Sequence, residues 1–304
     1  MGVVNVTPDS FSDGGRWFGA EAAIEHGLEI VAQGADIVDV GGESTRPGAQ
    51  RVPVDEELRR VKPVITELVR AGVVVSVDTM RAQVAEWALG AGVNLVNDVS
   101  GGLADPYMPR LVAKAGVPYV VMHWRGYSHD MYSRAVYVDV VREVHDELAR
   151  RIDAVTKEGV DPSMIVIDPG LGFSKNPAPS GPDAHNWQLL AGLRELATIG
   201  GRDFPVLVGA SRKRYLSRLS YPPGGRLPTV LAQGEESPKP SRGPVVRAGD
   251  GSPEQRSYSD NDDATAAITA LVAAAGAWCV RVHRVPANAD AVRVAAAYRA
   301  AARS

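Results

Sequence analysis

The 304-residue chain lacks the features that mark several large classes of protein. Its single cysteine, Cys279, cannot build an intrachain disulfide framework, which favours a reducing compartment. There are 33 lysines and arginines against 36 aspartates and glutamates, so the formal net charge of −3 gives no global basic field to attract nucleic acid or a membrane surface. The six histidines are scattered, and neither H-E-x-x-H nor C-x-x-C occurs, which argues against a zinc site.

Long hydrophobic runs are also missing. The longest uncharged stretch, residues 264–280, is mostly alanine, contains Thr265 and Thr269, and is interrupted by Gly276. This composition predicts a buried helix followed by a strand rather than a membrane span. No basic region followed by an apolar run stands at the N-terminus, so a secretory signal is not expected. We therefore expect a cytoplasmic protein with neither a membrane nor a nucleic acid as partner.

The chain does contain a repeating unit, a short β-branched apolar run that ends in a polar residue and precedes a helical stretch. The predicted strands are residues 2–6, 36–41, 73–78, 93–98, 119–123, 164–168, 206–209 and 278–283. Between them the apolar residues have helical spacing, as in Ile24, Leu28 and Val31, and glycines such as Gly34 and Gly72 follow the helices. Apolar strands that alternate with helices predict a parallel sheet covered by helices.

Eight such units predict an α/β fold, a single (β/α)8 TIM barrel that spans residues 1–304 as one domain. A doubly wound open sheet is the alternative, but the first strand is not followed by the phosphate-binding G-x-G-x-x-G turn. Two stretches interrupt the repeat. Residues 222–258, between strands seven and eight, are rich in proline and glycine and are predicted to be a disordered loop; residues 176–184 are a smaller insertion. Both are expected to be surface insertions, with a lid as the alternative for the longer one.

Every predicted strand delivers polar groups at its C-terminal end, where TIM barrels carry their active sites. These groups are Asn5, Asp39 with Glu43, Asp78, Asn97 with Asp98, His123, Asp168, Ser211 with Lys213, and Arg281 with His283. A single aspartate after a strand is more often a helix cap or a turn former, and Asp98 and Asp9 are the most open to that interpretation. Their joint occurrence at one rim indicates a binding site.

The sign of the charge differs around this rim. Strands seven and eight carry Arg212, Lys213, Arg281 and His283, which suit phosphate oxygens. The carboxylates and the carboxamide come from strands three, four and six, and suit a flat heterocycle rich in N–H groups. Internal ion pairing, for example of Asp168 with Lys213, is the alternative.

Two other chemistries are weaker interpretations. Cys279 stands inside an apolar strand, which indicates a core residue rather than a nucleophile. Lys213 would suit a Schiff base only if it were buried, and its neighbours Arg212 and Arg214 predict a polar, solvated setting.

Taken with their neighbours, these residues resemble dihydropteroate synthase, the pterin-binding barrel family of folate biosynthesis. The matching strings are N-V-T-P-D-S-F-S-D-G-G (5–15), D-V-G-G-E-S-T-R-P-G (39–48), S-V-D-T (76–79), N-D-V-S-G-G (97–102), M-H (122–123), D-P-G-L-G-F (168–173), G-A-S-R-K-R (209–214) and V-R-V-H (280–283). The likeness covers the whole chain apart from the two insertions. The sequence departs from the family pattern at Arg284 and in the stretch after Met122.

The resemblance implies a transferase that condenses 6-hydroxymethyl-7,8-dihydropterin diphosphate with 4-aminobenzoate, releases diphosphate and is a target of sulfonamides. The pterin would be held by Asp78, Asn97, Asp168 and Lys213 between walls formed by Met122, Phe173 and Gly209. The diphosphate would lie against Asn5, Arg281 and His283, with Mg²⁺ bound through Asn5. The aminobenzoate would contact Thr45, Arg46, Pro47 and Ser211, and a flexible loop with Asp9 and Phe11 would close over the site. Catalysis would rest on Asp78, Asp168, Lys213, Arg281 and His283.

The family is also expected to be homodimeric. Two alternatives remain, a methyltetrahydrofolate-dependent methyltransferase and a catalytically silent pterin-binding paralogue. The first lacks a diphosphate leaving group, so the cationic residues of strands seven and eight argue against it. The second is opposed by the intact set Asn5, Arg281 and His283.

Overall fold

The computed structural model describes residues 1–7, 16–44, 49–127, 134–175, 184–217 and 261–302. Several predictions fall outside these ranges: the loop residues Asp9 and Phe11, the aminobenzoate contacts Thr45, Arg46 and Pro47, the 222–258 insertion, and nearly all of the 176–184 insertion. They stay predictions.

All eight predicted strands are present and run parallel. They are β1 (Gly2–Asn5), β2 (Val38–Gly41), β3 (Val75–Asp78), β4 (Leu95–Asp98), β5 (Tyr119–Met122), β6 (Ile165–Asp168), β9 (Leu207–Val208) and β10 (Cys279–Val280). The first six form one sheet in chain order, and β9 pairs with β10. Parallel bridges from Ile167 to Val206 and from Gly2 to Val282 join these two sheets at both edges. The strands therefore follow one another around a closed ring, and no edge of it is left open.

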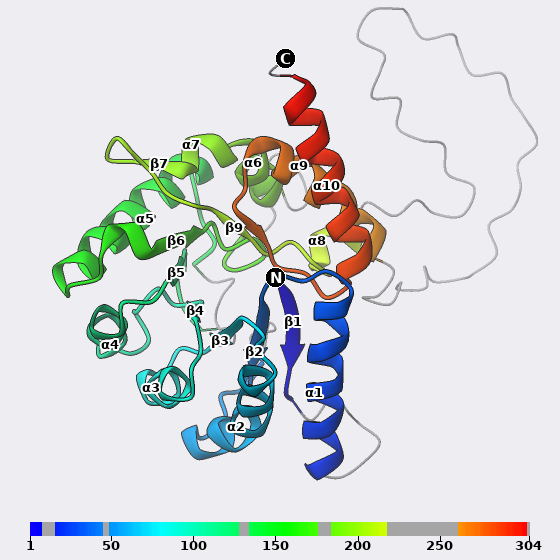
Figure 1. Cartoon of the computed structure of the whole chain (residues 1–304). Coiled ribbons are helices and arrows are strands. Elements are labelled where there is room, and N and C mark those ends of the chain that lie inside the picture. The colour runs from blue at the N-terminus through cyan, green and yellow to red at the C-terminus, as the bar shows by residue number, and fades with distance from the viewer. Residues whose placement is uncertain (8–15, 45–48, 128–133, 176–183, 218–260, 303–304) are drawn as a thin grey trace, which may run out of the picture.

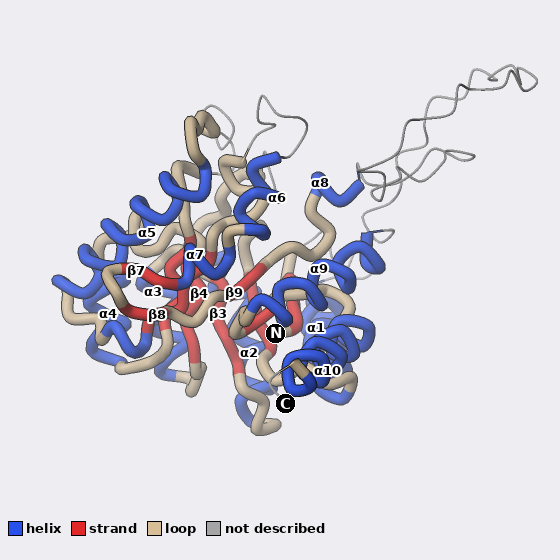
Figure 2. The backbone as a smooth tube through the Cα atoms, turned by 90° about the horizontal axis from the view of Figure 1, so that it is seen from above, coloured by secondary structure: helices blue, strands red, loops and turns tan. Residues whose placement is uncertain are grey.

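The helices lie outside this ring of strands, as Figures 1 and 2 show. They are α1 (Arg16–Ala32), α2 (Val54–Arg70), α3 (Ala82–Gly90), α4 (Met108–Ala115), α5 (Val140–Lys157), α6 (Ala184–Ala191), α7 (Leu193–Ala197), α8 (Arg214–Ser217), α9 (Asp262–Ala275) and α10 (Val285–Ala301). Gly34, Gly72, Gly92, Gly116 and Gly159 follow helices with positive φ, which confirms their predicted role as helix stops. No helix in the described ranges is both long and apolar enough to cross a membrane.

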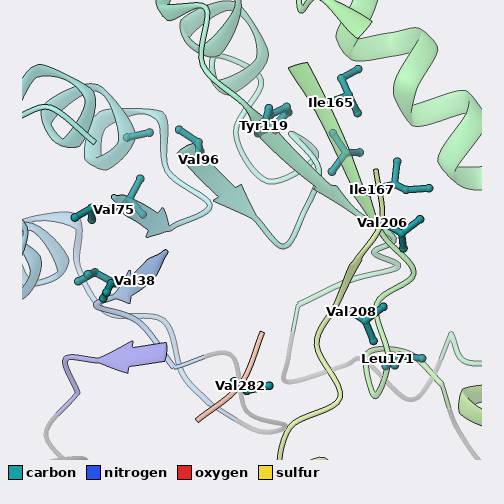
Figure 3. Close-up of a cluster of buried hydrophobic side chains, with 14 of the residues drawn as sticks. Val38, Val75, Val96, Tyr119, Ile165, Ile167, Leu171, Val206, Val208 and Val282 are labelled. Atoms are coloured by element: carbon teal, nitrogen blue, oxygen red, sulfur yellow. The ribbon is translucent and has the colours of Figure 1, made fainter. Parts of the chain in front are cut away.

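Alternate side chains of each strand form two separate cores. The outward residues pack against the helices in a large cluster that includes Val38, Val75, Val96, Tyr119 and Ile165, which Figure 3 shows on successive strands. A second cluster of Met1, Leu95, Val120, Val166 and Leu207 fills the ring near the N-terminal ends of the strands. Cys279 packs against this second cluster, as predicted for a core residue. This apolar layer lies toward the N-terminal ends of the described strands, and the row of polar residues lies at their C-terminal ends.

The structure corrects some predicted boundaries. The regular strands are shorter than the apolar runs, because residues such as Val206 and Val282 pair only through single bridges. An antiparallel hairpin of β7 (Thr198–Ile199) and β8 (Arg202–Asp203), which was not predicted, precedes β9. Gly200 and Gly201 supply the positive φ angles of its turn, and this Gly-Gly pair was the available signal.

Candidate active site

Strand register brings the first group of predicted site residues to one level of the barrel mouth. Asn5 pairs with Gly41, Gly41 with Asp78, and Asp78 with Asn97, so these residues form one row across β1 to β4. Gly41 contributes space to this row, since a Cβ at that position would lie 3.3 Å from the Cβ of Asp78. The shared edge that the sequence predicted for these polar groups is confirmed.

A buried ionic network fills the mouth beneath this row. Arg281 donates from Nε to Asp39 Oδ2 at 2.5 Å and from Nη2 to Asp78 Oδ2 at 2.7 Å. Asn97 donates from Nδ2 to the same oxygen of Asp39 at 3.0 Å. Asp39 is fully buried, and its Oδ1 has no hydrogen-bond partner among the described residues. Asp39 stands at a predicted strand end, and the sequence predicts no role for it. Its signal was a carboxylate inside an otherwise apolar strand.

This network places Arg281 among the residues of the predicted pterin set. Its guanidinium was predicted to hold diphosphate, yet Nε and Nη2 donate to carboxylates. Nη1 takes part in neither of these two hydrogen bonds. The attraction of Asp39 and Asp78 raises the pKa of Arg281 further above its ordinary value against the opposing effect of burial. For Asp78, burial is the largest effect and raises the pKa to about 7, with Arg281 opposing it and Asp39 adding to it. One guanidinium carries a single positive charge, so it cannot neutralise the negative charges of both carboxylates.

Asp168, at the end of β6, faces the opposite side of the mouth. Its Oδ1 accepts a hydrogen bond from the backbone N–H of Gly170 at 2.7 Å, and burial raises its pKa. Gly209, directly after β9, lies beside the other oxygen, since a Cβ there would be 3.8 Å from Asp168 Oδ2. An acceptor beside an unfilled position is what a bound N–H-rich ring requires.

Lys213 reaches into the same region from the loop after β9. Its Nζ lies 4.2 Å from the centre of the Phe173 ring, and a Cβ on Gly172 would lie 3.0 Å from its Cδ. Burial lowers the pKa of Lys213 to about 8, with the charge of Asp168 opposing the shift. Met122 and Phe173, which are predicted to form the slot walls, belong to one apolar cluster with Met80 and Val99.

Lys213 is half-buried between its two arginine neighbours, of which Arg212 is half-buried and Arg214 is exposed. Arg212 adopts a positive φ of 56° and binds Asp262 on α9 through Nε and Nη2, at 2.9 and 3.0 Å. Its charge is therefore directed to a helix and away from Lys213. The ion pairs at the mouth are those of Arg281, not the Asp168–Lys213 pair considered from the sequence.

Another polar contact joins the loops after β9 and β10 at the rim of the barrel. Ser211 Oγ lies 3.0 Å from His283 Nδ1 and accepts a hydrogen bond from the His283 backbone N–H at 3.2 Å. Two residues that the resemblance assigns to different substrates, aminobenzoate and diphosphate, are thus in direct contact.

The loop that follows β2 is anchored by a group of charges that the sequence did not reveal. Glu43 accepts from Arg51 Nε at 3.1 Å, from the Val52 backbone N–H at 3.1 Å and from Arg81 Nη1 at 2.9 Å. Arg81 also bonds the buried carboxylate of Glu57. These contacts tie Glu43, just after β2, to Arg51, Val52 and Arg81.

Asp98 has the structural role that the sequence left open. It accepts hydrogen bonds from the backbone N–H of Ser100 and Gly102 and from the hydroxyls of Ser100 and Tyr119. Its side chain lies on the helix side of β4, in the same register position as the outward Val121. It organises the turn after the strand and faces away from the mouth.

Within the described ranges, no three or more histidine, cysteine, aspartate or glutamate side chains are grouped so that they could hold a metal ion. Asn5 offers a half-buried carboxamide at the mouth, and its oxygen is a ligand type that Mg²⁺ accepts. Mg²⁺ commonly needs only one or two protein ligands when substrate phosphates supply the rest. The donor set therefore fits an ion that arrives with a phosphorylated substrate.

Known proteins share both the sequence and the fold. The model of the pterin binding enzyme family matches residues 1–283. The dihydropteroate synthase of Mycobacterium leprae is 48% identical over 299 residues, which cover 98% of this chain and 92% of that protein. The structure of dihydropteroate synthase from Xanthomonas albilineans in complex with 7,8-dihydropteroate matches with a TM-score of 0.75 and 38% identity, covering 99% of this chain and 93% of that one.

The Yersinia pestis dihydropteroate synthase, in a structure with a sulfonamide drug, matches with a TM-score of 0.79 and 32% identity, covering 99% of this chain and 94% of that one. Sequence, family model and fold agree over nearly the full length. The chain belongs to the dihydropteroate synthase family of pterin-binding enzymes.

Proposed function

We propose that the chain is a transferase that joins 6-hydroxymethyl-7,8-dihydropterin diphosphate to 4-aminobenzoate, forming 7,8-dihydropteroate and diphosphate. The observation that carries this proposal is the composition of the barrel mouth. Acceptors and donors for a flat heterocycle, Asp78, Asn97 and Asp168, stand there beside the cations Arg281 and Lys213. The product complex of the Xanthomonas albilineans relative supports the same chemistry.

In the pterin half of the site, Asp78 and Asp168 accept hydrogen bonds from the amino and ring N–H groups of the pterin. Lys213 donates to the pterin carbonyl, and its pKa of about 8 keeps most of the lysine protonated at neutral pH. Asn97 donates to Asp39 through Nδ2, so its own carbonyl oxygen is the atom left to accept from the ring. Met122 and Phe173 cover the faces of the ring, and Gly209 leaves room for its edge.

In the diphosphate half, His283 and the Nη1 group of Arg281 donate to phosphate oxygens. Asn5 would hold Mg²⁺, which would supply charge neutralisation for the leaving diphosphate. The bond between the pterin methylene and the diphosphate oxygen breaks, and the aminobenzoate nitrogen then forms its bond to the methylene. Diphosphate leaves with the bonding electron pair, and the attacking amine releases one proton to solvent water.

The carboxylates explain why departure of diphosphate is possible. Positive charge develops on the methylene and spreads over the electron-rich dihydropterin ring. Asp168 and Asp78 stabilise that charge, and both stand in a mouth where burial strengthens electrostatic effects. The aromatic amine is already nucleophilic, so no strong general base is required. Ser211 and the segment with Thr45, Arg46 and Pro47 receive the aminobenzoate, and sulfonamides compete there.

One assay tests this function. The protein is incubated with the pterin diphosphate, 4-aminobenzoate and Mg²⁺, and dihydropteroate and released diphosphate are both measured. Equal amounts of the two products are expected. Strict dependence on a corrinoid partner would favour the methyltransferase alternative, and pterin binding without turnover would favour the silent paralogue.

We also propose that the chain is one barrel domain with 222–258 as an insertion. The support is that β9 and β10, on either side of that stretch, pair with each other in the ring. Deletion of residues 222–258 should leave turnover and both KM values unchanged, whereas loss of turnover would favour a lid.

A homodimer in the cytoplasm is proposed on the family likeness alone. Sedimentation equilibrium should give about twice the chain mass of 32.2 kDa. Fluorescent tagging of the protein in its host should give diffuse cytoplasmic signal.

A further inference from the structure

Lys175, in the loop after β6, has a buried ammonium that the proposed reaction does not use. Only 2% of the residue is exposed. Its Nζ lies 2.8 Å from the carbonyl oxygen of Phe173, 3.2 Å from that of Gly170 and 3.0 Å from Nδ1 of His123. An ammonium has three N–H donors and no acceptor, so these three acceptors use its full capacity. A buried charge is costly unless it is bonded in this way.

The two carbonyls belong to the turn that shapes the pterin slot. Gly170 donates its N–H to Asp168, and its φ of 69° with a virtual Cβ 2.5 Å from the His123 carbonyl oxygen leaves no room for a side chain. Phe173 carries the ring that faces Lys213 Nζ. The ammonium of Lys175 therefore donates to the backbone at both ends of this turn. At one end is Gly170, which donates to Asp168, and at the other is Phe173, the proposed slot wall.

A second set of contacts ties the ammonium to helix α5. Because Lys175 donates to Nδ1 of His123, the other ring nitrogen carries hydrogen and donates to Glu147 on α5 at 2.9 Å. Arg125 bonds the same carboxylate at 2.5 Å and lies 3.8 Å from the ring centre of Tyr137. Tyr137 returns to the loop by donating its hydroxyl to the carbonyl of Ser174 at 3.0 Å. Lys175 thus holds the turn at the carbonyls of Gly170 and Phe173, and Tyr137 holds the next residue, Ser174.

We propose that Lys175 is a positioning residue for the pterin: its ammonium fixes the turn from Gly170 to Phe173 and so sets the geometry of Asp168 and of the slot wall. It does not touch the reacting atoms. This inference rests on the assignment of the mouth to a pterin. It predicts a substrate-selective defect, because the aminobenzoate contacts come from other loops.

Lys175→Met tests the inference, since methionine keeps the length of the side chain and removes its donors. The KM for the pterin diphosphate is expected to rise on the order of tenfold or more, with the KM for 4-aminobenzoate within twofold of wild type. Binding of a free pterin without diphosphate, measured by calorimetry, should weaken by the same factor. The midpoint of thermal unfolding should change little, because loss of the buried charge offsets loss of its bonds. Lys157→Met, at the exposed end of α5, is the matched control.

Lys175→Gln provides a second variant if the methionine protein does not fold. It retains donors without the charge, so the same substrate selectivity is expected with a smaller increase in the pterin KM. Unchanged pterin affinity together with a lowered unfolding midpoint would show a purely structural lysine and overturn the proposal. An equal rise in both KM values would overturn it as well. If wild type binds pterin but makes no product, the proposed reaction fails, while the binding comparison still decides the role of Lys175. Absence of pterin binding by wild type would overturn both.

Discussion

Arg281 Nε donates a hydrogen bond to Asp39 Oδ2 at 2.5 Å, although the two residues are separated by 242 positions in the chain. Closure of the barrel joins Val282, just after β10, to β1, which pairs with β2, and so brings Arg281 within reach of Asp39. Asp39 also holds Asn97, and Arg281 also holds Asp78. The buried carboxylate of Asp39 thereby holds two residues of the proposed pterin site, Asn97 directly and Asp78 through Arg281.

Asp39→Asn should weaken catalysis through Arg281 and Asn97 without touching the substrate. Removing one partner of a buried ion pair leaves the other charge uncompensated, which costs about 3 kcal/mol of stability. The variant should lose stability by roughly this amount and kcat/KM by about a hundredfold, measured by urea unfolding and steady-state kinetics. Asp36→Asn, at an exposed position just before the same strand, is the matched control. Wild-type kcat/KM in Asp39→Asn would contradict the positioning role.

Asp168→Asn should lower kcat far more than it perturbs folding. Asparagine can still accept the hydrogen bond from Gly170, and burial disfavours the charged form of Asp168, so the neutral residue should fold well. The transition-state charge loses its partner, and kcat should fall by about 10²- to 10³-fold. Single-turnover kinetics and thermal unfolding measure the two effects. Near-wild-type turnover would exclude the electrostatic role of this carboxylate.

Gly209→Ala should separate substrate binding from stability. The added Cβ would be 3.8 Å from Asp168 Oδ2, an ordinary van der Waals contact, and Gly209 is not among the glycines with positive φ. The protein should unfold at its normal temperature. The methyl group would enter the pterin slot, so the pterin KM should rise by about 10-fold or more. An unchanged pterin KM would place the pterin elsewhere.

Stability should rise with pH because of the pair His123 and Lys175. Burial lowers the pKa of His123 from 6.5 to about 4 and that of Lys175 from 10.5 to about 7. In each case the unfolded chain binds the proton more readily. The free energy of unfolding therefore increases from pH 4 to 6.5 through His123 and from pH 7 to 10.5 through Lys175.

Urea unfolding of wild type and His123→Gln at pH 4.5 and 6.5 measures the first of these windows. Wild type should lose on the order of 2 kcal/mol more than the variant on acidification. His26→Gln is the control, since that side chain is 39% exposed on α1. Equal losses in wild type and His123→Gln would show that His123 does not supply the pH dependence.

Asn5→Ala should raise the Mg²⁺ concentration needed for half-maximal turnover and leave pterin binding without diphosphate intact. The carboxamide oxygen is the ligand proposed for the ion, and the substrate phosphates would still hold it weakly. A titration of activity with Mg²⁺ after treatment with a chelator measures this shift. An unchanged Mg²⁺ requirement would remove Asn5 from the metal site.

Much of the fold and of the site could be predicted from local patterns. The eight apolar runs and the polar residues at their ends are contiguous in the chain, so periodicity locates the strands and the mouth. The predictions failed where a contact is made by residues distant in sequence. Arg212 follows Ser211 directly, yet its charge is bound to Asp262, fifty positions away along the chain.

The sequence by itself determined the order of strands and helices and the types of polar groups at the rim. Only the tertiary structure decided which of those groups are paired. It assigned Asp39 to Arg281, turned Arg212 toward α9, placed Asp98 in a turn, and enclosed Lys175 among three acceptors. The physical reason is that hydrophobic periodicity is a local property of the chain. The bonds and pKa values of buried charges depend instead on distances that exist only once the ring has closed.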